Sequence, residues 1–434
     1  MLSRRILGLV AAGVLVAAGV AFAREPNVAH AAPRSPSTAE VLSPGAARNV
    51  TRKVVDATVG NLAHPARLGG LFERLDELEG RRAKADVRIV QFGDSHTASD
   101  YGTSVARARL AARFGDGGRG FLPMGEPYRR LFQAGEAMSR GTGFAADGAP
   151  LFGSRTTGDG LFGLAGFAMD TRAPGASMRS DLTASADRLE LAYLAQPGGG
   201  SFDVWIDGVR KERVATHQAT RASAFRTIAV ARGPHTLEAR AVGDGPLRIF
   251  GVRLDDDALG ITFDSLGMNG ARATTPLASD ETNFGEQLAR VAPALAILAY
   301  GTNESGDSVT TPEDHGAAIR SLAARVRKGA PSASCIVLGA PDRDGGGRGG
   351  AHTLPKLIEI LAAQREAADA AGCAFYDQFA AMGSEGAIAR WSVESPPRAR
   401  RDLVHLTRAG YAVLAEALVR DLTSSYAAWK AEPR

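Results

Sequence analysis

From residue 86 onward, short apolar runs alternate with longer stretches of helical periodicity. The apolar runs are typical of strands buried on both faces, and they lie at 87–92, 295–300, 334–338 and 373–376. Helix-forming stretches stand between and after them, at 104–114, 285–291, 317–326, 355–370 and 409–422. This alternation predicts a parallel sheet with helices on both faces.

The stretch from 142 to 258 follows a different pattern. Short β-like runs occur at 188–194, 202–206, 225–230, 236–242 and 247–254, separated by Gly, Asp and Pro turns. Within one of them, Phe202 to Ile206, apolar and polar residues alternate, and Asp207-Gly208 then supplies a turn. Several antiparallel strands at such close spacing predict a β-sandwich. We therefore expect an α/β domain in two parts, 61–141 and 259–425, interrupted by an inserted sandwich at 142–258 and followed by a tail at 426–434.

The N-terminus indicates export. Arg4 and Arg5 precede an uncharged apolar run at 6–21, and Ala21-Phe22-Ala23 places small residues where a signal peptidase cuts, so we interpret 1–23 as a signal peptide. The alternative is an uncleaved membrane tether, because the run approaches the ~20 residues that span a bilayer. Both interpretations place the rest of the chain outside the cytoplasm, in the periplasm, the cell envelope or the extracellular space. Residues 24–60, rich in Ala, Pro, Ser and Arg, are expected to form a flexible linker.

Charge and cysteine content narrow the function classes. The chain has 434 residues, with 51 Lys and Arg against 47 Asp and Glu, and its arginines are scattered, which argues against a nucleic-acid partner. Cys335 and Cys373 each lie in an apolar strand-like run, and this favours two buried free thiols over a disulfide, although export permits one. With no Cys-x-x-Cys and no His-Glu-x-x-His, we expect no zinc or other metal site. The oligomeric state stays open.

Ser95 is the first candidate for chemistry. It stands in Gly93-Asp94-Ser95, directly after one predicted strand and before a helix. Ligands of open α/β sheets bind beyond the carboxyl ends of the strands, and a serine there has its backbone N–H near the positive end of the helix. Such a motif is also an ordinary helix cap, and a serine hydroxyl needs a base before it becomes a nucleophile.

The segment before the last helix offers that base. In Asp402-Leu403-Val404-His405, the three-residue spacing lets the Asp402 carboxylate reach one ring nitrogen of His405. The carboxylate then fixes the tautomer, and the other ring nitrogen can take the Ser95 proton. The alternative interpretation is a helix cap beside an incidental histidine.

Two further segments supply hydrogen-bond donors. Gly270 follows the apolar run at 260–263, and Asn303, in Gly301-Thr302-Asn303, follows the run that ends at Tyr300. Together with the Ser95 N–H they provide donors for the negative charge on a tetrahedral intermediate, each worth ~3–4 kcal/mol in known cases.

In chain order, these segments resemble the four sequence blocks of the SGNH (GDSL-like) hydrolases. The likeness covers 86–130 and 259–425 and implies a flavodoxin-like three-layer α/β/α fold with no cofactor. It also implies roles for the matching residues: Ser95 as nucleophile, Asp402 and His405 as its partners, and an oxyanion hole formed by Ser95, Gly270 and Asn303. Gly267 also fits the second block, but Gly270 is preferred because the family glycine usually ends a Gly/Ser-x-x-Gly string.

A closer likeness concerns the strings at 93–100, 114–121 and 402–411, which are similar to those of bacterial peptidoglycan O-acetylesterases. Those enzymes carry a sandwich resembling a carbohydrate-binding module before the second block, where the insertion falls here. The resemblance implies an exported esterase that removes acetyl groups from an O-acetylated glycan, peptidoglycan in particular. The open alternatives are a polysaccharide O-acetyltransferase, a general acyl esterase of the family, and a non-catalytic glycan-binding wall protein.

A few other residues are weaker candidates for substrate binding. His96 follows the nucleophile and could shape the pocket, with a structural hydrogen bond as the equal alternative. Arg119 could meet a substrate carboxylate bidentately. Three aromatic residues of the insert, Trp205, Phe225 and Phe250, could stack on sugar rings, but core packing is the favoured interpretation for each.

Overall fold

The structure, a computed structural model, describes residues 58–128, 131–149, 158–345 and 352–432. The predicted signal peptide at 1–23 lies outside these residues, as does all but the end of the predicted linker at 24–60. Within the described ranges, no helix combines the length and the apolar character needed to cross a membrane.

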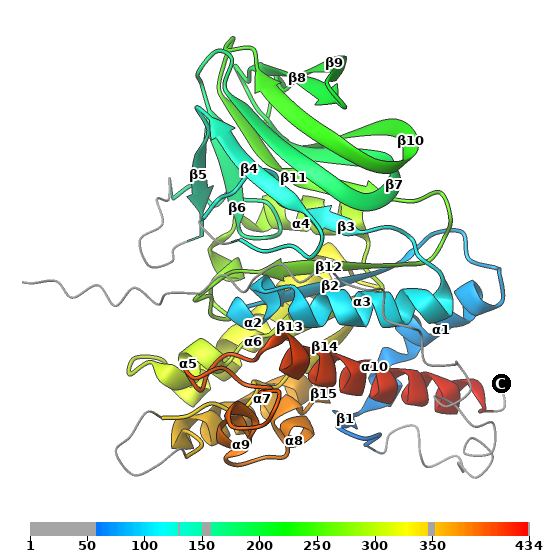
Figure 1. Ribbon diagram of the computed structural model, residues 1–434, viewed down its shortest axis with the longest axis vertical. Helices are drawn as coiled ribbons and strands as arrows, with labels where there is room; N and C mark the ends of the chain where they lie inside the picture. Colours follow the sequence, from blue (N-terminus) through cyan, green and yellow to red (C-terminus); the bar gives the residue numbers. More distant parts are fainter. Residues whose placement is uncertain (1–57, 129–130, 150–157, 346–351, 433–434) are drawn as a thin grey trace, which may run out of the picture. The chain divides into compact units, whose positions relative to one another are not determined.

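One sheet of the described chain contains six strands (Figure 1). Their spatial order is β1 (Leu62–Ala63), β15 (Ala374–Tyr376), β14 (Ser334–Leu338), β13 (Leu295–Ala299), β2 (Val87–Gly93) and β12 (Ile261–Gly267). All neighbours pair in parallel except β1, which runs antiparallel to β15. The five parallel strands, numbered along the chain, are thus arranged 2-1-3-4-5, the flavodoxin-like order. The predicted α/β fold is confirmed.

Helices cover both faces of this sheet (Figure 1). One face packs against α1 (Gly69–Glu79), α3 (Tyr101–Phe114) and α10 (Arg408–Lys430), and the other against α4 (Glu281–Val291), α6 (Pro312–Gly329) and α7 (Pro355–Ala371). Shorter helical segments are η2 (Pro65–Leu68), α2 (Ser95–Ala98), η3 (Pro276–Ala278), α5 (Thr302–Gly306), α8 (Gln378–Met382) and α9 (Ala387–Ser392). Successive strand side chains point to opposite faces, so Ile89 joins one hydrophobic core and Val90 the other. This two-sided burial is why the strands read as continuous apolar runs.

The second sheet is antiparallel and, within the described residues, contains nine strands. These are β3 (Gly120–Leu122), β4 (Ala137–Thr142), β5 (Ala145–Gly148), β6 (Phe167–Thr171), β7 (Ser177–Ala195), β8 (Ser201–Ile206), β9 (Val209–Ala215), β10 (Ala222–Ala241) and β11 (Leu247–Asp255). Register shifts near Gly233 interrupt the pairing of the long strands β7 and β10, so that the two predicted runs at 225–230 and 236–242 are one strand. An inserted antiparallel structure is confirmed. Its start at 142 stays a prediction. β3 and β4, which begin before that residue, belong to the same sheet.

A buried ion pair joins the two sheets. Arg253 of β11 contacts Asp264 of β12 at 2.5 Å, and Asp264 also accepts the backbone N–H of Phe121 in β3 at 2.9 Å. Both charged side chains are almost fully buried, and each is a partner for the other, as buried charges require. The insert is therefore fixed to the same strand that leads to the candidate oxyanion segment.

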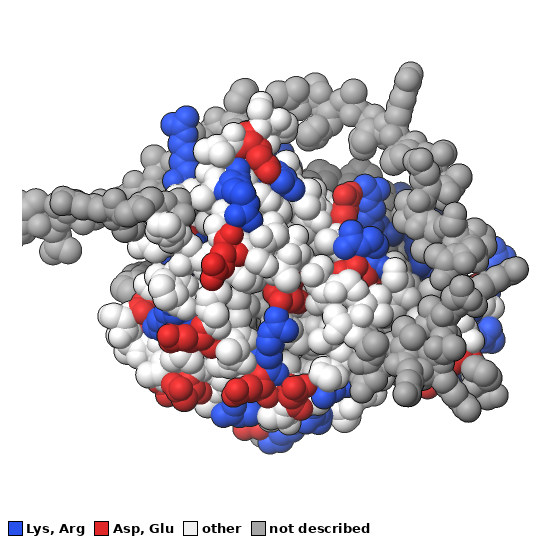
Figure 2. Space-filling view, turned by 90° about the horizontal axis from the view of Figure 1, so that it is seen from below, with Lys and Arg blue, Asp and Glu red and all other residues white. Residues whose placement is uncertain are grey.

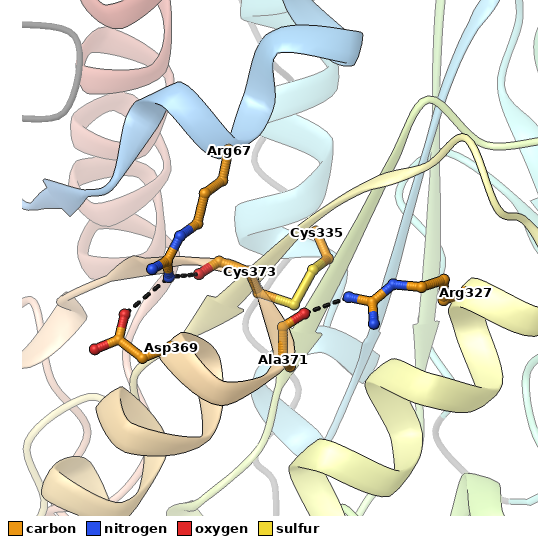
Figure 3. Close-up of a disulfide and its surroundings, with 6 residues drawn as sticks. All are labelled: Arg67, Arg327, Cys335, Asp369, Ala371 and Cys373. Carbon is orange, nitrogen blue, oxygen red and sulfur yellow. Dashed lines mark hydrogen bonds and ion pairs between the residues drawn. A yellow bond between two sulfur atoms is a disulfide. The ribbon is translucent and has the colours of Figure 1, made fainter.

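The prediction of free thiols is wrong, because Cys335 and Cys373 form a disulfide (Figure 3). Cys335 lies in β14 and Cys373 immediately precedes β15, and the parallel pairing of Ile336 with Ala374 places the two cysteines side by side with their Cα atoms 4.8 Å apart. The carbonyl of Cys373 accepts a hydrogen bond from Arg67 at 2.8 Å. Apolar surroundings alone do not reveal this register, so the sequence pattern could not distinguish a bridge from two thiols.

Candidate active site

Ser95 lies at the carboxyl end of β2, where the order of strands reverses. The next strand of this sheet along the chain, β12, lies on one side of β2, and the one after it, β13, lies on the other. Such a switch point is where open α/β sheets bind ligands. Ser95 is the first residue of α2, and Asp94 caps this helix by accepting the His96 N–H at 2.9 Å. The cap and the nucleophile interpretations of Gly93-Asp94-Ser95 are therefore compatible, since neighbouring residues serve the two purposes.

The structure brings Ser95, His405 and Asp402 into one hydrogen-bonded chain. Ser95 Oγ lies 2.9 Å from His405 Nε2, and His405 Nδ1 lies 2.8 Å from Asp402 Oδ2. The other carboxylate oxygen of Asp402 accepts the backbone N–H groups of Val404 and His405 at 3.0 and 2.9 Å. This order of contacts is the one that a serine nucleophile, its base and an orienting acid require.

Asp402 stays ionised because its hydrogen bonds outweigh its burial. Burial alone would raise its pKa, but the hydrogen bonds from the ring and backbone of His405 hold the pKa of Asp402 well below its ordinary value. An ionised Asp402 keeps the Nδ1 proton of His405 in place and favours the imidazolium that forms when His405 takes a proton.

Gly270 and Asn303 are the predicted oxyanion donors besides the Ser95 N–H. Gly270 lies in the turn after β12 with a φ of 80°, and a Cβ added there would meet nothing within 4 Å. Gly267 instead ends β12, and a Cβ there would lie 2.2 Å from the Ala98 backbone nitrogen, so this glycine permits close packing against α2. Asn303 uses one amide N–H to reach the carbonyl of Ala271 at 2.8 Å, which leaves its second N–H for a ligand. This geometry favours Gly270 over Gly267 as the donor.

Glu304, which the sequence analysis did not single out, links the two donor segments. Its carboxylate accepts the Ala273 N–H at 2.8 Å and the Gly301 N–H at 3.1 Å, so it connects the turn containing Gly270 to the turn containing Asn303. The ring of His315 in α6 lies 3.0 Å from the same carboxylate, and neither side chain is exposed beyond 2%. Its place after Asn303 is visible in the sequence, but its partners lie on other segments.

His96 packs behind the reacting residues. Its ring lies 5.5 Å from that of His405 between centroids, and its Nδ1 lies 3.0 Å from the hydroxyl of Tyr411. Burial lowers the pKa of His96 to about 3, so its ring is neutral at neutral pH. Burial also raises the pKa of Asp94 to about 7. A neutral His96 adds no second positive charge beside a protonated His405, and this supports the structural interpretation of His96 over substrate binding.

A cavity of about 50 Å³ adjoins the site. Asp94, His96 and Tyr411 line it together with apolar residues of α10. Ser95, Asn303 and His405 are not among its lining residues, so the cavity does not face the serine hydroxyl.

Arg119 does not reach the site. It is buried and contacts Asp100 at 2.7 Å and Gln133 at 2.8 Å, which gives it a structural role in an internal ion pair. Phe250 is also buried in the core. Arginine side chains stack on the rings of Trp205 and Phe225, 4.1 and 5.6 Å from their centroids. Charges of both signs are interspersed on the face shown in Figure 2, in line with the scattered charge of the sequence.

Residues 234–413 match the GDSL-like lipase/acylhydrolase family. The matched segment includes Gly270, Asn303, Asp402 and His405. Ser95 lies before it in the chain, separated from it by most of the strands of the insert. A search among curated protein sequences found no match.

Solved structures provide a second comparison. A structure described as "Peptidoglycan O-acetylesterase in action, 5 min" is 25% identical, with a TM-score of 0.67 over 82% of this chain and 96% of its own. A carbohydrate esterase family 2 enzyme with a carbohydrate-binding domain from Corynascus thermopiles (Myceliophthora fergusii) is 13% identical, with a TM-score of 0.30 over 59% of this chain and 95% of its own. A family two carbohydrate esterase from Clostridium thermocellum, in complex with cellohexaose, is 12% identical, with a TM-score of 0.28 over 65% of this chain and 98% of its own.

Proposed function

The chain belongs to the GDSL-like lipase/acylhydrolase (SGNH) family and is an ester hydrolase, and from that premise we propose that it removes O-acetyl groups from a cell-wall glycan, namely peptidoglycan. The hydrogen-bonded chain of Ser95, His405 and Asp402 carries the catalytic part of the proposal. The likeness to a peptidoglycan O-acetylesterase over 82% of the chain supports the substrate.

The first step acylates the serine. Ser95 Oγ attacks the acetyl carbonyl carbon while His405 Nε2 takes the hydroxyl proton, so that the carbonyl oxygen becomes an oxyanion. The N–H groups of Ser95, Gly270 and Asn303 hold that charge. Collapse of the intermediate breaks the bond to the sugar oxygen, and this oxygen leaves with the proton from His405.

The second step hydrolyses the acyl-serine and regenerates the free enzyme. His405 takes a proton from a water molecule, and the resulting hydroxide attacks the acetyl carbon of the acyl-serine. The same donors hold the second oxyanion until the bond to Ser95 Oγ breaks. Acetate is released, and Ser95 recovers its proton from His405.

Export forms part of the proposal. The disulfide between Cys335 and Cys373 supports it, because structural disulfides persist mainly in oxidising compartments outside the cytoplasm. A glycan of the cell wall would be accessible to the enzyme there.

The test is acetate release from three substrates: O-acetylated peptidoglycan, acetylated xylan and phenyl acetate. We expect the highest kcat/KM on peptidoglycan and no release by Ser95→Ala. Equal kcat/KM on both glycans would refute the substrate while leaving the ester hydrolase intact. Newly acetylated sugar in place of free acetate, in the presence of a glycan acceptor, would indicate an O-acetyltransferase.

A further inference from the structure

Arg343 lies between the two halves of the candidate site. It follows β14, the strand beside β13, and its Nη1 donates to the carbonyl of Thr302 at 2.7 Å, immediately before Asn303. The next residue, Asp344, donates its backbone N–H to the carbonyl of Leu403 at 2.9 Å, in the loop that carries Asp402 and His405. Arg343 is thus held beside both the oxyanion donors and the base.

The guanidinium of Arg343 is half-buried yet has no carboxylate in ion-pair contact within the described chain. Its Nε is buried without a hydrogen-bond partner. Asp402 and Asp94 act on its charge from beyond contact distance, and burial lowers its pKa. An arginine remains protonated at neutral pH even so, and the site therefore holds a positive charge whose donors are largely uncommitted.

Other buried arginines of the described chain differ in this respect. Arg253 pairs with Asp264 and Arg119 with Asp100, and Arg248 contacts three aspartates. Removing a charge from water costs free energy unless a partner replaces the water. An arginine left without such a partner at the edge of an active site is placed to receive one from a ligand.

We propose that Arg343 binds a carboxylate carried by the sugar whose acetyl ester is cleaved. The guanidinium presents paired N–H groups that match the two oxygens of a carboxylate. In N-acetylmuramic acid that carries no peptide, the lactyl ether ends in such a carboxylate, on the ring that bears the acetylated hydroxyl. The proposed contact therefore applies to glycan strands from which the peptide has been removed. This inference rests on the proposed function and adds to it the group by which an acidic sugar is distinguished from a neutral one.

Two matched esters test the assignment: the acetyl esters at the primary hydroxyl of N-acetylmuramic acid and of N-acetylglucosamine. These substrates differ only in the lactyl ether. A charge-assisted hydrogen bond is worth ~1.5–3 kcal/mol, so we expect Arg343→Gln to reduce the ratio of their kcat/KM values by ~10–100-fold, and Arg343→Lys to reduce it less, since lysine keeps the charge without the planar pair of donors.

Arg401→Gln is the matched control. Arg401 is exposed, next to Asp402, and its removal changes net charge by the same amount. We expect it to keep the wild-type ratio. The assignment is overturned if Arg343→Gln lowers kcat/KM equally for both esters, which would indicate a structural role through Thr302, or if Arg401→Gln alone removes the preference.

The proposed function can fail separately. Wild-type enzyme that hydrolyses phenyl acetate but neither sugar ester would refute the glycan substrate. Inhibition of phenyl acetate hydrolysis by free N-acetylmuramic acid then decides the role of Arg343. The assignment predicts inhibition that weakens at least ~10-fold in Arg343→Gln, whereas equal inhibition of both proteins, or none of either, overturns it.

Discussion

Replacing Glu304 by alanine should uncouple the two oxyanion segments. In the wild-type protein one carboxylate oxygen accepts the Ala273 N–H and contacts the ring of His315, while the other accepts the Gly301 N–H. Burial would raise the pKa of Glu304, but its hydrogen bonds with His315 and with the Ala273 N–H hold that pKa below the ordinary value. The variant therefore loses an ionised and fully enclosed acceptor.

The expected loss has two parts. Removing the carboxylate leaves its donors buried and unpaired, which costs about 1–3 kcal/mol of unfolding free energy for each unsatisfied group. Loss of one well-placed oxyanion donor costs about 10²–10³ in kcat. Since substrate binding does not depend on the oxyanion, we expect kcat on phenyl acetate to fall by about this factor with KM nearly unchanged.

Steady-state kinetics and urea unfolding of the same preparations measure both parts. Glu304→Gln keeps one acceptor oxygen but directs an NH₂ group at a backbone N–H, so its kcat should lie between those of wild type and alanine. Asp421→Ala is the control for stability, because Asp421 is a buried carboxylate of α10 that accepts the Asn61 N–H at 3.0 Å, on a segment that provides no oxyanion donor. Wild-type kcat in folded Glu304→Ala, or the same loss of kcat in Asp421→Ala, would refute the reasoning.

Three further predictions follow from the geometry. Ser95→Ala should lower kcat on phenyl acetate by at least ~10³ with an unchanged melting temperature; residual activity near wild type would exclude Ser95 as nucleophile. Replacing both Cys335 and Cys373 by alanine opens a loop closed over 38 residues and should lower the unfolding free energy by about 2–4 kcal/mol, measured in urea against reduced wild type, which should show the same loss. The pKa of His96 is lowered to about 3, so its contribution to stability is complete above pH 6.5 and is lost as pH falls towards 3. The pKa of Asp94 is raised to about 7, so its contribution is complete below pH 3.8 and is lost as pH rises through 7. Asp94→Asn should therefore steepen acid destabilisation between pH 6.5 and 4, by up to ~1.4 kcal/mol per pH unit; an unchanged slope in urea titrations would contradict it.

The parts of the fold that were predictable are those encoded locally. Strands such as β2 and β13 are buried on both faces, so each forms an apolar run that needs no knowledge of its neighbours. Asp402 and His405 are three residues apart, and their contact follows from one turn of chain. Ser95 was identified because it directly follows a strand, and the structure then placed it 2.9 Å from His405.

The parts that were not predictable depend on which segments become neighbours. Cys335 and Cys373 meet through the register of two parallel strands, and neither strand contains that register by itself. His315 reaches Glu304 from the first turn of another helix. The charge of Arg119 suggested a ligand, but its partner Asp100 became evident only from the packing of α3. Pairs of this kind depend on tertiary structure, and the periodicity of a sequence does not show which distant segments pack together.

The contact between Ser95 and His405 spans 310 positions of the chain and the whole inserted sheet. During synthesis, the nucleophile therefore emerges long before the base that activates it. A chain that has stopped before Asp402 and His405 carries a serine that cannot be acylated at a useful rate. Recovery of esterase activity after denaturation therefore reports when the C-terminal segment reaches Ser95, and it can be compared with the return of β-structure in the insert.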